Sequence, residues 1–275
     1  MGDQGAGYRY PRFEREMLLE GLSFRGGPPP GRALPEFDLP TTDGDRLRKS
    51  DFVGQRPLLL SFASITCPMV AGNGPALKRL HEEFGERVAF VTLYVREAHP
   101  GGRYPQADAL EQKLRYARAY KERDRIPWPV AVDSVEGDLH RALDPKPDAA
   151  YLMDAYGDVA FRAVSSSDGR VLREGLEALV SDQPLPIGER QPRVVPLLKG
   201  LGMMSEILDF AGREAKEDFR RELPPVYALA HLASLLRPLP PLGRGIAAIA
   251  TSVLGLTAVL GGLGYLLELR SRPSR

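Results

Sequence analysis

Pro57-Leu-Leu-Leu-Ser-Phe-Ala-Ser-Ile-Thr-Cys-Pro68 joins a short apolar run to a cysteine and a proline. The run 57–63 is long enough for a buried strand and too short for a helix. Apolar residues then recur near helical spacing over 68–84, and a proline suits the first helical turn because no N–H donor is needed there. The sequence therefore predicts a buried strand, Cys67 just beyond its end, and a helix that begins at Pro68.

The segments that follow alternate between expected strands and expected helices. The strands cover 88–95, 129–133, 149–154 and 158–163, and the helices cover 107–123, 135–143 and 171–180. Strands that alternate with helices imply a mostly parallel sheet covered on both faces, and the final hairpin adds an antiparallel edge. This order predicts an α/β protein with a thioredoxin-like fold, in which a central mixed sheet is flanked by helices and one βα unit is inserted.

The sequence predicts five parts, of which the thioredoxin-like domain is one. We expect a flexible N-terminal segment over 1–32, a thioredoxin-like domain over 33–184, a helical linker region over 185–243, a transmembrane helix over 244–269 and a basic tail over 270–275. The linker region contains two apolar helical patterns, at 194–211 and 226–236. These helices either pack on the domain and on each other, or lie at a membrane surface.

Residues 245–267 contain no charged residue, and a helix of this length rises about 35 Å, enough for a hydrocarbon core of about 30 Å. A buried core helix is the alternative. We expect a single-pass C-terminal membrane anchor, with the preceding domain in the cytoplasm because no export signal precedes it and arginines cluster in the tail. Small residues in the helix would also permit a homodimer.

Composition excludes several functions. The formal net charge is +1 and no basic stripe is interleaved with aromatics, so a nucleic-acid partner is not expected. Cys67 is the single cysteine, which excludes an intramolecular disulfide, a CxxC redox pair and a zinc ribbon. The four histidines lack metal-ligand spacing, so we expect neither a metal nor another cofactor.

Cys67 is the candidate nucleophile. A thiol at the start of a helix faces the positive end of the helix dipole and free N–H groups, which lowers its pKa and favours the thiolate. Ser64 and Thr66 are placed to hydrogen-bond the sulfur or its reaction partner. The alternative is that Cys67 is a small buried apolar residue without a reactive role.

Two further segments carry candidate site residues. Glu97 and His99 follow the strand 88–95, and the carboxyl ends of parallel strands share one sheet edge, so His99 is expected near Cys67 as an acid/base oriented by Glu97. Solvated loop residues are the alternative. Pro147 precedes the strand 149–154, where thioredoxin-like domains commonly have a cis proline facing the cysteine, although Pro145 is close by.

These segments together resemble the iodothyronine deiodinase family, a branch of the thioredoxin-like superfamily close to the peroxiredoxins. The resemblance covers about 33–180 and rests mainly on Phe62-Ala-Ser-Ile-Thr-Cys-Pro68 and Leu93-Tyr-Val-Arg-Glu-Ala-His-Pro100. It implies that Cys67 takes the position of the family's selenocysteine, and that Glu97 and His99 take active-site positions.

The chain departs from the family pattern in three ways. A thiol replaces the selenol, Tyr104 is the nearest match to the family's tryptophan, and the expected anchor lies at the other end of the chain. Peroxiredoxins share Ser64 before the cysteine, but their upstream proline is replaced by Leu60. The resemblance therefore implies the fold more strongly than the substrate.

Three functions remain open from the sequence. The leading hypothesis is a one-cysteine thiol oxidoreductase of peroxidase or antioxidant type, in which Cys67 attacks a peroxide or disulfide and an external thiol of the thioredoxin or glutathione kind restores it. The second is a reductive dehalogenase. The third is a non-catalytic thioredoxin-like binding or assembly module.

Overall fold

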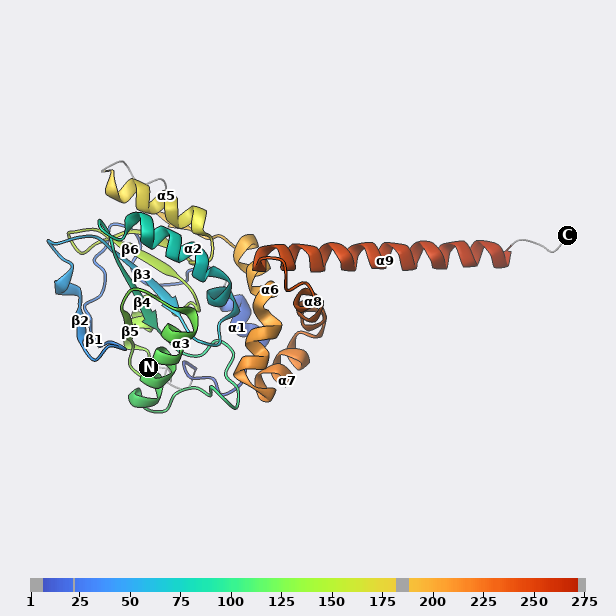
Figure 1. Cartoon of the computed structure of the whole chain (residues 1–275), viewed down its shortest axis with the longest axis horizontal. Coiled ribbons are helices and arrows are strands. Elements are labelled where there is room, and N and C mark those ends of the chain that lie inside the picture. The colour runs from blue at the N-terminus through green and yellow to red at the C-terminus, as the bar shows by residue number, and fades with distance from the viewer. Residues whose placement is uncertain (1–6, 22, 182–187, 272–275) are drawn as a thin grey trace.

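The computed structural model describes residues 7–21, 23–181 and 188–271, and a six-stranded sheet lies at the centre of the domain (Figure 1). Its spatial order is β5-β4-β3-β6-β7-β8. The strands span Leu58–Ala63 (β3), Ala89–Tyr94 (β4), Val130–Val132 (β5), Ala150–Met153 (β6), Val159–Ala163 (β7) and Glu189–Arg190 (β8). β3, β4 and β5 run parallel, β6 and β7 form an antiparallel hairpin beside β3, and β8 runs parallel to β7.

The alternation of side chains along β3 supplies both cores of the domain. Leu59 and Ala63 point into one apolar cluster, whereas Leu58, Leu60 and Phe62 point into the other. All six residues of the strand are buried, as expected for a strand covered on both faces. The central position of β3 therefore places the residues that follow it, including Cys67, at the middle of one sheet edge.

Helices cover both faces of this sheet. In the domain they span Pro68–Phe84 (α2), Leu110–Asp124 (α3), Asp138–Ala142 (α4) and Gly169–Val180 (α5), and a short hairpin of Asp38–Pro40 (β1) and Arg46–Arg48 (β2) precedes β3. The expected α/β, thioredoxin-like fold with a central mixed sheet is confirmed, and every expected strand and helix of the domain is present. Two differences are observed: the helix expected over 107–123 begins at Leu110, three residues later than the sequence pattern indicated, and β8 adds a strand to the sheet from the region expected to be a helical linker.

The N-terminal segment is packed against the domain over its described residues, contrary to the flexible segment that we expected. Tyr8 is 3% exposed and Phe13 is 4% exposed. The Tyr8 hydroxyl lies 2.8 Å from Nδ1 of His140, and the Arg12 guanidinium donates to the buried Asp218. A short helix, α1 (Arg15–Glu20), follows. Residues 1–6 and 22 lie outside the described residues.

Three helices follow the domain, at Val194–Ala211 (α6), Arg213–Glu222 (α7) and Pro224–Ser234 (α8). They form a third apolar cluster, to which Phe13 also contributes, and α6 packs against α2. Of the two alternatives for the expected helices, packing on the domain and on each other is observed. α7 was not expected, because it is mostly charged and buries little more than Ala215, Asp218 and Phe219.

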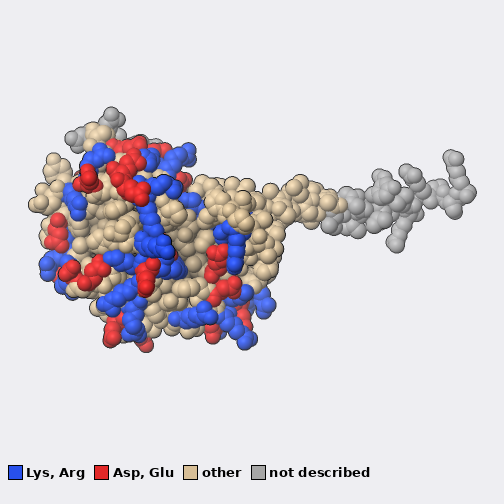
Figure 2. Space-filling model, in the orientation of Figure 1, with Lys and Arg blue, Asp and Glu red and all other residues tan. Residues whose placement is uncertain are grey.

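The last helix, α9, spans Pro241–Ser271 and projects away from the rest of the chain (Figure 1). Among the described residues it is the one helix that is long and apolar enough to cross a membrane, over Pro241–Ala258. Few of the side chains in this window are buried, unlike those of a core helix. Charged side chains cover the rounded body but not the described part of this projection (Figure 2). The last four residues of the expected basic tail, 272–275, lie outside the described residues.

Candidate active site

Cys67 is the N-cap residue of α2, at the position that the sequence predicted. Its extended backbone (φ −93°, ψ 117°) turns the chain from β3 into the helix, and its N–H donates to the Ser64 carbonyl at 3.2 Å. The N–H groups of Met69 and Val70 lie near the sulfur and favour the thiolate. The side chain is completely buried (0% exposed).

Burial reverses the expected direction of the pKa shift of this thiol, which is raised and not lowered. Removal from water raises the pKa of Cys67 well above its ordinary value, the negative charge of Asp148 raises it further, and the N–H groups at the start of α2 lower it by less. The sequence predicted a lowered pKa for Cys67 from the helix terminus alone. The structure adds an apolar enclosure, built from distant segments, whose desolvation cost is larger.

His99 lies in the same cavity as Cys67, so the predicted meeting of the two residues at one sheet edge is observed. Its ring is packed between Phe13, at 4.5 Å between ring centres, and Phe219, at 5.5 Å. The side chain is buried, and its Nδ1 atom has no hydrogen-bond partner within the described part of the chain. Burial lowers the pKa of His99 to about 4, which keeps the imidazole neutral near pH 7.

Glu97 is buried beneath this cavity, but it does not orient the His99 ring. Its carboxylate accepts from the Thr66 hydroxyl at 2.6 Å and from the Tyr94 hydroxyl at 2.5 Å. The Thr66 oxygen in turn accepts the His99 backbone N–H at 3.2 Å. Burial raises the pKa of Glu97 to about 7, although these hydrogen bonds oppose the increase.

Thr66 and Ser64 therefore link two loops through hydrogen bonds, and neither is hydrogen-bonded to the Cys67 sulfur. The Ser64 hydroxyl oxygen accepts the backbone N–H of Ala98 at 3.2 Å. Through Thr66 and Ser64 the loop after β3 is joined to the loop after β4, which fixes Cys67 relative to His99.

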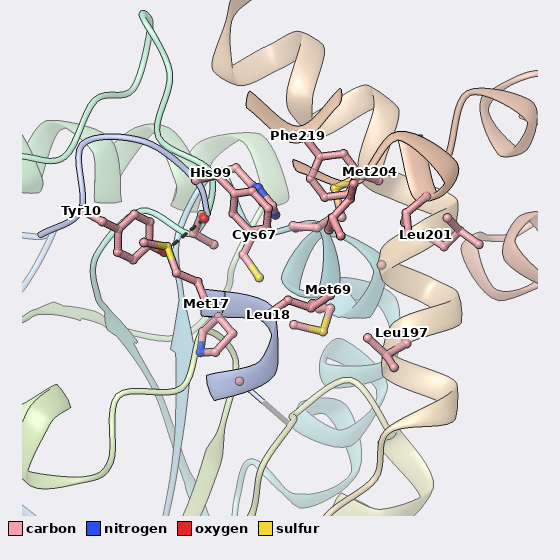
Figure 3. A pocket seen from close by; sticks show the side chains of 18 of the residues that line it. Tyr10, Met17, Leu18, Cys67, Met69, His99, Leu197, Leu201, Met204 and Phe219 are labelled. Atoms are coloured by element: carbon pink, nitrogen blue, oxygen red, sulfur yellow. Dashed lines mark hydrogen bonds between the residues drawn. The ribbon is translucent and has the colours of Figure 1, made fainter. Parts of the chain in front are cut away.

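The cavity has a volume of about 120 Å³ and three walls (Figure 3). The domain contributes Cys67, Met69 and His99 among others, the N-terminal segment contributes five residues, and the helices α6, α7 and α8 contribute the opposite side. The segments outside the domain supply Tyr10, Phe13, Met17, Leu18, Gly21, Leu197, Gly200, Leu201, Met204, Phe219, Leu223 and Val226. Almost the whole lining is apolar, and Arg96 is the one charged residue among the described residues that form it.

Pro147 lines the cavity with Cys67, as predicted for the active-site proline, and so does Pro145. The expectation of a cis peptide bond was wrong, because none occurs in the described part of the chain. Asp148, which follows, was not singled out from the sequence. It is buried, and it accepts hydrogen bonds from the Ser165 and Ser167 hydroxyls at 2.5 and 2.9 Å.

A single buried cysteine at the joint between a central strand and a helix, with a histidine from the next strand beside it, defines a one-cysteine thioredoxin-like protein. Comparison with known proteins gives the nearer relationship. Residues 28–147 match the sequence model of the family described as iodothyronine deiodinase. The chain is thus similar to that family over the region that contains Cys67, Glu97 and His99, and the expected resemblance is confirmed there.

Individual relatives agree with this match. The chain is 32% identical to thyroxine 5-deiodinase of Gallus gallus over 117 residues, which cover 38% of this chain and 45% of that protein. It is 34% identical to type II iodothyronine deiodinase of Mus musculus over 86 residues, which cover 30% of this chain and 32% of that protein. The matched region therefore spans less than half the length of these curated relatives.

Solved structures of low sequence identity also resemble the domain. An uncharacterized conserved protein from Geobacillus kaustophilus has a TM-score of 0.49 at 22% identity, with 59% of this chain and 87% of that chain covered. A thiol:disulfide interchange protein described as a putative DsbE, from Chlorobium tepidum, has a TM-score of 0.46 at 20% identity, with 56% of this chain and 99% of that chain covered.

Proposed function

We propose that this chain is a membrane-tethered, one-cysteine thiol oxidoreductase of peroxidase type, with Cys67 as the nucleophile and an external thiol as the reductant. The observation that carries the proposal is the pairing of Cys67 with His99 in one apolar cavity, where the His99 Nδ1 atom is buried and has no described partner. A buried polar atom without a partner is costly, so it is retained more readily when it serves a substrate or a proton. The similarity to iodothyronine deiodinases through both residues supports redox chemistry at this site.

Both groups are neutral in this structure, because burial penalises the thiolate and the imidazolium alike. A thiolate–imidazolium pair compensates part of this penalty by mutual attraction, and the N–H groups at the start of α2 stabilise the sulfur further. We propose that substrate entry triggers the transfer, in which His99 accepts the Cys67 proton.

The reaction follows from this pair. The thiolate attacks the terminal oxygen of the hydroperoxide, an S–O bond forms and the O–O bond breaks. The leaving alkoxide takes the proton from His99, so the products are an alcohol and a Cys67 sulfenic acid. The sulfur loses two electrons, and the peroxide gains them.

Recovery requires a second thiol. Cys67 is the single cysteine in the sequence, so no internal residue can resolve the sulfenic acid. An external thiol of the thioredoxin or glutathione kind condenses with it, releasing water and forming a mixed disulfide, and a further thiol then frees Cys67.

Reductive dehalogenation of an aromatic substrate is the second candidate, and the similarity to iodothyronine deiodinases favours it. In this reaction the Cys67 thiolate attacks the halogen, so that a sulfur–halogen bond forms, the carbon–halogen bond breaks and the ring carbon takes the proton from His99. An external thiol then displaces halide and forms a mixed disulfide with Cys67, which a further thiol reduces. Halide release from a panel of halophenols, measured with thiol present, distinguishes this activity from peroxide reduction.

The test of the proposed function is thiol-dependent consumption of hydroperoxide by the full chain, compared with Cys67→Ser. Serine preserves the size of the side chain and removes the nucleophile, so turnover is expected to vanish. Peroxide and halide turnover that are absent from wild-type protein, with a cellular role that survives Cys67→Ser, would instead identify a binding or assembly module.

The tether proposal rests on α9, which is long and apolar enough to span a membrane. We propose that the domain faces the cytoplasm. Protease protection in sealed vesicles tests both: full digestion of the domain by external protease in cytoplasm-side-out vesicles is expected, and release of the intact chain by carbonate washing would contradict the anchor. Crosslinking in the same vesicles tests for a homodimer through this helix.

A further inference from the structure

Helix α6 is a wall shared by the Cys67 cavity and α9. Leu197, Leu201 and Met204 lie on the face of α6 that lines the cavity. Leu198 and Gly202 lie on a neighbouring face, where a Cβ atom at Gly202 would clash with the Pro241 backbone at the start of α9. Because a helix with its side chains is about 10 Å wide, the cavity lies about one helix width from the proposed anchor.

The crossing of α6 and α9 is close on both helices. A Cβ atom at Gly245 would clash with the backbone of Leu198, so each helix presents a glycine where the other approaches. The Arg244 guanidinium adds a hydrogen bond to Glu206 of α6 at 2.9 Å. The anchor is therefore fixed to the wall of the cavity, with a tight contact in place of a flexible tether.

Most of the exposed large apolar side chains belong to the part of the chain that includes α6 and α9. Of the twelve exposed large apolar side chains in the described residues, nine lie between residues 194 and 256, and the other three are Val53, Leu110 and Tyr156. Leu197 belongs both to this surface, at 38% exposed, and to the cavity lining. Leu197 therefore joins the exposed apolar surface of α6 to the cavity at Cys67.

The cavity itself fits an apolar molecule. Its volume of about 120 Å³ is comparable to that of an engineered apolar cavity of about 150 Å³ that binds benzene. Arg96, the one charged residue in the described lining, is already engaged, since its guanidinium lies over the rings of Tyr8 and Tyr10 and donates to the Tyr8 carbonyl at 2.7 Å. Little in the lining would replace the water lost by a polar substrate.

We infer that the cavity selects an apolar hydroperoxide dissolved in the bilayer, which reaches Cys67 past Leu197, in preference to hydrogen peroxide from water. This inference rests on the proposed function and specifies its substrate class. The apolar part of the substrate occupies the space between α6 and His99, and its peroxide group faces the Cys67 sulfur.

The test uses the full chain in phospholipid nanodiscs, with cumene hydroperoxide as the apolar substrate and hydrogen peroxide as the polar one. Leu197→Asp places a charge at the mouth of the cavity. Val194→Asp is the matched control, because Val194 lies one turn earlier on α6, is 71% exposed and does not line the cavity. We expect Leu197→Asp to lower the ratio of the cumene hydroperoxide rate to the hydrogen peroxide rate by about tenfold or more, and Val194→Asp to leave this ratio within about twofold of wild type.

Three results would overturn the inference. The first is a wild-type protein that reacts with hydrogen peroxide as fast as with cumene hydroperoxide. The second is that the two aspartate variants behave alike. The third is that a phospholipid hydroperoxide in the same nanodisc as the protein oxidises Cys67 no faster than one in separate nanodiscs.

A binding measurement separates this inference from the proposed function. Cumyl alcohol has the same apolar group as cumene hydroperoxide but cannot oxidise a thiol. We expect it to shift the methyl NMR signals of Met69 and Met204, which line the cavity, and Leu197→Asp to weaken the effect. If neither hydroperoxide oxidises Cys67, the proposed function fails, while the alcohol still decides the inference: binding supports an apolar site, and its absence contradicts one.

Discussion

Replacing Glu97 by glutamine should remove a large pH dependence from the stability of the chain. Burial raises the pKa of Glu97 from 4.5 to about 7. A carboxyl with a higher pKa in the folded chain binds its proton more tightly when folded, so its contribution to stability is fully present below pH 4.5 and is lost as the pH rises through 7. A pKa difference of about 2.5 corresponds to about 3 kcal/mol of unfolding free energy.

Glutamine keeps the shape of the side chain and an oxygen that can accept from Thr66, but it has no proton to lose. The free energy of unfolding of wild type minus that of Glu97→Gln should therefore fall by about 3 kcal/mol between pH 4.5 and pH 8. Other buried groups, such as His99 and Asp148, are common to both proteins and cancel in this difference.

Equilibrium unfolding in urea measures the difference, followed by fluorescence of Trp128, the single tryptophan, which is buried in the core. Glu82→Gln is the matched control, because Glu82 is an exposed residue of α2 and its replacement should change stability by no more than about 0.5 kcal/mol at any pH. A wild-type-minus-Glu97→Gln difference that stays constant to within about 0.5 kcal/mol would refute the buried carboxyl network.

Three further predictions concern the cavity. Alkylation of Cys67 by iodoacetamide should be slow, with a midpoint above pH 9. Phe13→Ala should lower this midpoint and speed the reaction, because it admits water to the cavity. An unchanged midpoint would contradict enclosure as the cause of the raised pKa. His99→Ala should slow oxidation of Cys67 by hydroperoxide by about a hundredfold, with partial rescue by added imidazole. A rate for the variant within about twofold of wild type would exclude His99 as the proton acceptor. Phe219→Ala should lower the unfolding free energy by about 3 to 5 kcal/mol, because Phe219 is buried. Leu235→Ala, at an exposed site, should lower it by less than about 0.5 kcal/mol. Equal losses would argue against the packing of α7 on the cavity.

Local patterns predicted the core of the fold because their signals lie within a few residues. The apolar run before Cys67 and the helical spacing after Pro68 specify β3 and α2, and the common edge of parallel strands brings His99 to Cys67. The deiodinase-like motifs identified the same residues. These parts depend on no contact between distant segments outside the domain.

Distant contacts account for what the sequence did not predict. Phe13 and Phe219 enclose His99 from opposite ends of the chain, and no local periodicity reports that they meet. The same enclosure removes Cys67 from water and reverses its expected pKa. Thr66 was missed as a partner of Glu97 for a related reason, since the two residues follow different strands, β3 and β4, which pair side by side in the sheet.

The central claim is that Cys67 and His99 form one reactive centre. Its most direct test is intact-mass measurement of the rate at which Cys67 gains one oxygen atom from stoichiometric cumene hydroperoxide, in wild type and in His99→Gln, with free cysteine as the reference. We expect a wild-type rate well above that of free cysteine and a large decrease in the variant. A wild-type rate no greater than that of free cysteine, and unaffected by His99→Gln, would contradict a shared reactive centre.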